Sequence, residues 1–107
     1  MTNQNQSEKE ILMEIMDVVI KCHNYGINEV FVSGVTLNPN HQSQIRVLNG
    51  LLKENTSKYN YVFIDNSDIE EKHLWKDQLH LNNQGTIRLA CNFLDCLNKG
   101  TNINYFY

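Results

Sequence analysis

The sequence predicts an α/β fold that contains part of a doubly wound parallel sheet. Two short apolar runs, residues 30–32 and 62–64, are bounded by turn-forming residues, which is typical of strands covered on both faces. Segments with helical spacing of apolar residues lie before, between and after these runs. A strand–helix–strand unit of this length indicates a parallel pair with a right-handed crossover. Because small open sheets usually have more strands, we expect the sheet to lack its N-terminal strands.

The first helix is expected over residues 7–24. Ser7 can cap its N-terminus, and Glu10 three residues later completes a capping box. Gly26 follows as a residue that tolerates the left-handed backbone of a helix stop. The apolar residues that recur at three- and four-residue spacing are Ile11, Leu12, Ile15, Val18, Val19 and Cys22.

Two further helices follow the expected strands. Asn38 can cap the second one, with Pro39 at its first position, and it runs to about Thr56. The last helix begins near Asn83, with Asn82 or Asn83 as its cap. Their expected buried residues are Ile45, Leu48, Leu51 and Leu52 in the second helix, and Ile87, Ala90, Cys91, Leu94 and Leu97 in the last.

Length and composition indicate one small domain. The chain has 107 residues and is 41% apolar, so we assign residues 1–98 to a single partial domain and 99–107 to a polar tail with aromatic ends. A net charge of −3 without a basic stripe argues against nucleic-acid binding. No apolar stretch approaches the ~20 residues that span a membrane. The start, MTNQNQSEKE, has no signal-peptide features, so we expect a cytoplasmic protein.

The cysteines predict neither a disulfide framework nor a metal site. Cys22, Cys91 and Cys96 are odd in number, and each lies in an expected helix. We expect reduced thiols in buried or half-buried positions. No zinc-binding spacing accompanies Cys22, and no cofactor is expected.

Asp77 and His80 place an acid and a base just before the last helix. Sites in open α/β sheets collect beyond the carboxyl ends of the strands, and this loop follows the second strand. The spacing lets the carboxylate accept a hydrogen bond from the nearer imidazole nitrogen, which would orient the ring and stabilise the imidazolium. Leu79 and Leu81 could anchor the loop in the core. The pattern is typical of a general base.

Two other interpretations of these residues stay open. Asp77 and His80 could be surface residues that form only local hydrogen bonds within a turn. Alternatively, His73, Asp77 and His80 could form a two-histidine, one-carboxylate metal site, although Trp75 and Lys76 intervene and no further ligand pair stands out.

The segment DQLHLNNQG, residues 77–85, resembles the last conserved block of the SGNH (GDSL-type) hydrolases, a family of serine esterases. In that block, Asp-x-x-His is followed by Leu-Asn and by a Gly that opens the final helix. The element order over residues 7–98 is also similar to the second half of that flavodoxin-like, three-layer α/β/α fold. The resemblance implies Asp77 as the orienting acid and His80 as the general base.

Two other blocks of that family concern its N-terminal half. The family binds the oxyanion with an Asn in a Gly-x-Asn block, and Asn3 is a candidate remnant of this block, with Met1 in place of the Gly. The alternative is an N-terminal residue without a role. The nucleophilic Ser of the family lies in a Gly-Asp-Ser motif, which this sequence does not contain. We interpret Ser33 as a strand-end residue rather than as a replacement nucleophile.

These observations lead to two functional hypotheses. The first is the C-terminal portion of an SGNH-type serine esterase, which would act on a small ester in a complete site and be inactive alone. The second is a truncated, non-catalytic domain that binds a protein partner or self-associates through an exposed sheet edge. Candidates for the groove are Thr36, Leu37, Asn38, His41 and Trp75, although for Trp75 an anchor on the core is the favoured role.

Overall fold

The computed structural model describes residues 6–101 of the chain, and the side chains of residues 6–98. The expected order of helix, strand, helix, strand and helix is confirmed, with three short helical turns added. The elements are α1 (Glu8–Asn24), β1 (Phe31–Ser33), η1 (Pro39–His41), α2 (Gln42–Glu54), α3 (Thr56–Tyr59), β2 (Val62–Ile64), η2 (Glu71–His73) and α4 (Asn83–Thr101).

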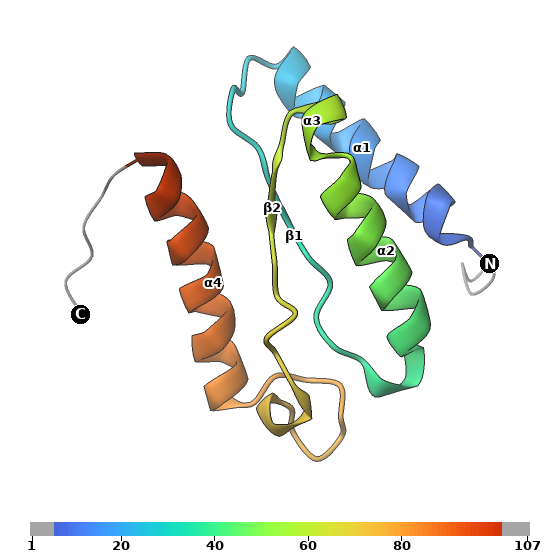
Figure 1. Ribbon diagram of the computed structural model, residues 1–107, viewed down its shortest axis with the longest axis vertical. Coiled ribbons are helices and arrows are strands. Elements are labelled where there is room, and N and C mark those ends of the chain that lie inside the picture. The colour runs from blue at the N-terminus through green and yellow to red at the C-terminus, as the bar shows by residue number, and fades with distance from the viewer. Residues whose placement is uncertain (1–5, 102–107) are drawn as a thin grey trace.

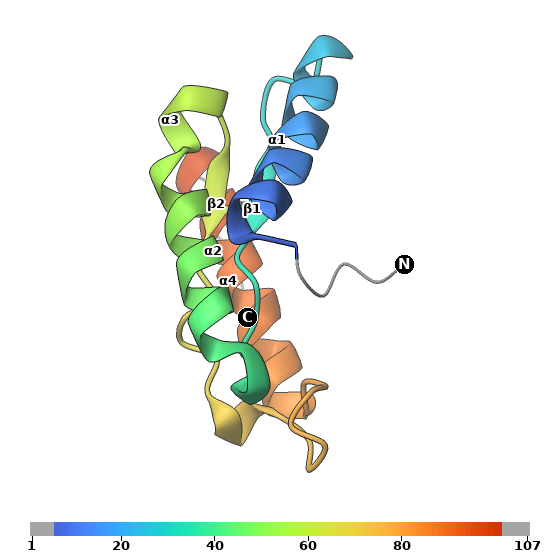
Figure 2. The ribbon, with the colours of Figure 1, turned by 90° about the vertical axis from the view of Figure 1, so that its right-hand side faces the viewer.

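A parallel pair of strands forms the centre of the fold, as predicted. Figures 1 and 2 show α4 on one face of this pair, and α1 with α2 on the other face. Within the described residues the sheet has the order β1-β2, so each strand is paired on one side only. The register pairs Phe31 with Val62, Val32 with Phe63 and Ser33 with Ile64.

The hydrophobic core lies mainly between α1 and α2. Met16 and Leu52 are fully buried at its centre. The phenol of Tyr61, the residue just before β2, donates a hydrogen bond to the carbonyl oxygen of Leu52. Burial, and then the neighbouring Tyr59, raises the pKa of this phenol. The buried residues of the cluster are Leu12, Met16, Val19, Leu48, Leu52 and Tyr61.

The expected helix boundaries are confirmed at α1 and change at α2. The Ser7 hydroxyl oxygen accepts a hydrogen bond from the Glu10 N–H at 3.1 Å, and Gly26 has a φ of +88°. The helix expected to run to residue 56 ends earlier, at Glu54. Asn55 is the C-cap: its main-chain N–H donates to the Leu51 carbonyl oxygen at 3.2 Å, and its side-chain amide donates to the same oxygen at 2.8 Å.

Several residues expected to be buried are exposed. Val18 is 59% exposed because it lies about 100° around the helix from the buried Val19. Ile87 is 63% and Leu97 41% exposed, and Ala90 is exposed too. The sheet beside α4 has only two strands within the described residues, too few to cover the whole apolar face of this helix. The three cysteines are half-buried, as expected.

Candidate functional site

The loop of residues 74–82 lies beyond the carboxyl end of β2, at the lower end of the molecule in Figure 1. Leu74 and Leu81 form an antiparallel bridge across it. The Trp75 N–H donates to the His80 carbonyl oxygen, and the Asn82 N–H donates to the His73 carbonyl oxygen, both at 2.8 Å. The loop is therefore a short hairpin with its tip at residues 76–79.

Asn82 fastens this hairpin to helix α4. Its side-chain oxygen accepts a hydrogen bond from the Gly85 N–H at 2.9 Å, which confirms the expected cap. Its amide nitrogen donates to the carbonyl oxygens of Lys72 at 2.8 Å and Leu74 at 3.1 Å. Gly85 is buried, and an added Cβ there would collide with the carbonyl oxygen of His73. Only glycine allows the helix to approach this closely.

Asp77 and His80 form the predicted hydrogen bond. His80 Nδ1 lies 2.6 Å from Asp77 Oδ2. The other carboxylate oxygen, Oδ1, accepts from the N–H groups of Leu79 at 3.0 Å and His80 at 3.1 Å. Since an ionised carboxylate only accepts hydrogen bonds, Nδ1 is assigned as the donor. The carboxylate thus orients the imidazole while the turn orients the carboxylate.

The electrostatics of the pair favour an ionised aspartate. The hydrogen bond from His80, and then the two main-chain N–H groups, lowers the pKa of Asp77 to about 2. The side chains are 73% exposed for His80 and 48% for Asp77. Within the described part of the chain, His80 Nε2 has no hydrogen-bond partner. It is therefore free to exchange a proton with another group, as a general base must.

The hairpin corrects the expected roles of Leu79 and Trp75. Leu79 is 57% exposed, so it does not anchor the loop in the core. Leu74, 7% exposed, has that role, and Leu81 is half-buried beside it. Side chains alternate along a hairpin, so the neighbours Trp75 and His80 face outward together. Trp75 is 54% exposed, and the favoured role as a core anchor is wrong.

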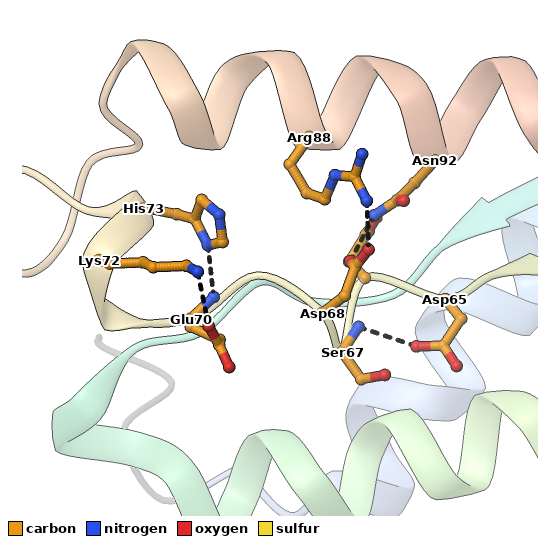
Figure 3. A network of polar contacts seen from close by, with 9 residues as sticks. Asp65, Ser67, Asp68, Glu70, Lys72, His73, Arg88 and Asn92 are labelled. Carbon is orange, nitrogen blue, oxygen red and sulfur yellow. Dashed lines mark hydrogen bonds and ion pairs between the residues drawn. The ribbon is translucent and has the colours of Figure 1, made fainter.

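The alternative of a metal site formed by His73, Asp77 and His80 is also wrong. The Nδ1 atom of His73 accepts a hydrogen bond from the Glu70 N–H at 2.8 Å (Figure 3), so this ring is tied to its own helical turn. Among residues 6–98, no group of three His, Cys, Asp or Glu side chains could hold a metal ion.

Ser33 is tied into the end of the sheet rather than to a base. Its hydroxyl donates to the Gly34 carbonyl oxygen at 3.1 Å and accepts from the Asn66 amide at 2.9 Å. Asn66, only 4% exposed, also donates to the Gly34 carbonyl oxygen at 2.9 Å. Its side-chain oxygen accepts from Asn92 on α4 at 3.1 Å. These bonds agree with the interpretation of Ser33 as a strand-end residue.

The polar network around Asn66 was not predicted. Figure 3 shows Arg88 and Asn92 reaching from α4 to Asp68. The distances to the Asp68 carboxylate are 2.8 Å from the Asn92 amide and 3.3 Å from the Arg88 guanidinium. These partners lie 20 to 26 positions apart in the sequence, so local spacing gives no sign that they interact.

The residues proposed for a substrate groove do not line one common cavity. Asn38 caps the turn η1 through the Asn40 N–H at 3.1 Å. Thr36 is half-buried beside it, and neither residue lines the cavity that lies next to α2, whereas Leu37 does. His41 lies at two other hollows near the start of α2. Asn3, the oxyanion candidate, lies outside the described residues.

No protein-family model, curated protein or solved structure matches this chain. Over the described residues, no helix combines the length and the apolar character needed to cross a bilayer.

The Asp77 carboxyl is expected to titrate near its shifted pKa of about 2. A depressed pKa stabilises the fold above the unfolded value of ~3.9, and this contribution disappears as the pH falls through the folded value. The pair lies in solvent, so its effect on the free energy of unfolding is small. Carbon-13 NMR of the Asp77 carboxyl is the suitable measurement.

His80→Ala should raise the Asp77 midpoint, because it removes the largest cause of the shift. The main-chain N–H bonds remain, so the midpoint should stay below that of an unstructured aspartate. His73→Ala serves as the control and should leave the Asp77 midpoint unchanged. A midpoint that does not respond to His80→Ala would contradict the observed pairing.

Proposed function

We propose that this chain is the C-terminal portion of an SGNH-type serine esterase and supplies the acid and base of its site. The observation that carries the proposal is the 2.6 Å hydrogen bond between Asp77 and His80, which leaves His80 Nε2 free. The loop also lies at the edge where sites form in parallel sheets. His80 would remove the proton from a serine as it attacks the ester carbonyl, and Asp77 would stabilise the imidazolium.

The nucleophile is proposed to be absent from this chain. The sequence contains no Gly-Asp-Ser motif, and the Ser33 hydroxyl is engaged by Gly34 and Asn66. The two-stranded sheet would then be the last part of a larger doubly wound sheet, whose missing strands would carry the serine. The exposed apolar residues of α4 and the unpaired strand edge support this view. The substrate would be a small ester, bound once a complete site is assembled.

Two measurements test this proposal. The purified chain should not hydrolyse p-nitrophenyl acetate above the rate of its His80→Ala variant. A fusion that places an SGNH-type N-terminal segment, with its Gly-Asp-Ser motif, ahead of residue 1 should gain activity. His80→Ala in that fusion should lower the rate by roughly 10²–10⁴-fold, the usual contribution of a general base.

The controls separate the parts of this proposal. A folded, active fusion that keeps full activity after His80→Ala would contradict the role of the base. If the unfused chain is active and this activity requires both His80 and Ser33, the proposal that the nucleophile is absent from this chain is wrong. A folded fusion without any activity would contradict the esterase assignment.

The second candidate is a non-catalytic domain that binds a protein or a second copy of itself. The specific observation in its favour is that each strand of the described sheet is paired on one side only. Free strand edges accept further strands. Sedimentation measurements over a range of concentrations test self-association, and a strict monomer would count against it.

A further inference from the structure

A cavity separate from the Asp77–His80 loop lies between α2 and the segment that follows β2. Its volume is about 450 Å³, within the range of roughly 300–1,000 Å³ that is common for small-molecule sites. Residues after both strands line it, so it occupies the crevice beyond the carboxyl ends of a parallel pair. The side chains on the α2 side are Gln42, Ile45, Arg46 and Asn49.

Two asparagines hold the walls of this cavity in place. Asn49 accepts from the Val35 N–H at 2.8 Å and donates to the Val35 carbonyl oxygen at 3.0 Å, which fixes the segment after β1. Asn66 is buried, and it bonds to Ser33, Gly34 and Asn92. These amides are engaged by the protein, so they shape the cavity rather than bind a ligand.

One cation on the cavity wall is unpaired. Over residues 6–98, the ion pairs involve Lys72, His80 and Arg88, and none involves Arg46. The apolar side chains beside it include Leu37 and Ile45, both half-buried, and Ile69, which is 3% exposed. The cavity therefore combines a free guanidinium with an apolar surface.

The opposite rim is acidic. Glu70 and Glu71 line the cavity, and Figure 3 shows Ser67 and Glu70 pointing from their segment toward α2. Glu70 is partly neutralised by Lys72 at 3.5 Å. Carboxylates at this rim repel a second negative charge on a ligand, so they disfavour polyanions such as phosphate esters.

We propose that this cavity binds a small organic monocarboxylate. Arg46 pairs with the carboxylate through its planar set of N–H donors, which matches two oxygen atoms. Leu37, Ile45 and Ile69 cover an apolar body of a few carbons. The site includes neither Asp77 nor His80 and does not depend on esterase activity.

The test is a titration of the full chain with sodium hexanoate, followed by nitrogen-15 NMR. Saturable shifts are expected at the main-chain amides of Leu37, Asn49 and Ile69. Hexanol, which has the same length without the charge, should bind at least tenfold more weakly. Arg46→Gln should weaken hexanoate binding by roughly tenfold or more, as loss of a charged hydrogen-bond donor predicts.

Lys53→Gln is the matched control, because it removes one positive charge from the same helix outside the cavity lining. It should leave hexanoate binding unchanged, and so should His80→Ala. The proposal is overturned if a folded chain gives no saturable shifts with hexanoate, or if Arg46→Gln binds as tightly as the parent. Equal binding of hexanol, or tighter binding of inorganic phosphate, would overturn it as well.

Discussion

Gly85→Ala is expected to displace the hairpin of residues 74–82 and to separate Asp77 from His80. The new Cβ would collide with the His73 carbonyl oxygen, and it would lie 3.1 Å from the Leu81 side chain. A main-chain atom cannot move aside as the end of a flexible side chain can. The free energy of unfolding should fall by about 1–3 kcal/mol or more, as for other overpacked positions. Urea denaturation measures this loss.

Gly50→Ala is the matched control for that substitution. Gly50 also lies within a helix, but an added Cβ would meet nothing within 4 Å. Alanine should therefore stabilise the chain by roughly 0.5–1 kcal/mol, the usual difference in a helix interior. The Asp77 carboxyl midpoint should rise in Gly85→Ala and stay constant in Gly50→Ala. Equal stability of the two variants would mean that the close approach at Gly85 is not a real constraint.

Leu52→Ala is expected to have the largest effect on stability. Leu52 is completely buried between α1 and α2, and its carbonyl oxygen accepts a hydrogen bond from the Tyr61 hydroxyl. Removing its methyl groups should lower the free energy of unfolding by roughly 2–5 kcal/mol, from lost burial and from the cavity left behind. Total stabilities of small domains are only about 5–15 kcal/mol, so thermal unfolding followed by circular dichroism should show a large shift.

Val47→Ala provides the comparison within the same helix. Val47 is 51% exposed and lies outside the core cluster. Its replacement should change the unfolding free energy by no more than about 0.5 kcal/mol. Similar losses from both substitutions would contradict the placement of the core on the Leu48–Leu52 side of α2.

Local signals predicted the parts of the fold that local chemistry determines. The apolar runs at 30–32 and 62–64 predicted the parallel pair, and the three-residue spacing predicted the bond between Asp77 and His80. The cap at Asn82 followed from its place before a helical pattern. In each case the residues that interact are close in sequence, or their pattern repeats along one segment.

Other features depended on contacts that spacing does not contain. Leu79 was expected inside because it is apolar, but the bridge between Leu74 and Leu81 determines which loop side chains face the core. The exposure of Ile87 depends on how many strands lie beneath α4, which its own apolar pattern does not reveal. The cavity beside Arg46 forms where three separate segments of the chain meet, so no single sequence motif predicts it.

Contacts within the hairpin join residues that are close in sequence, whereas contacts at the end of the sheet join residues that are far apart in sequence. Asn66 bonds to Ser33 across 33 positions and to Asn92 across 26. The longest side-chain bond that shapes the hairpin, from Asn82 to Lys72, spans only 10. Short loops cost little entropy to close, so the acid and the base are ordered mainly by their own neighbourhood. They form a self-contained unit whose geometry tolerates changes elsewhere in the sheet.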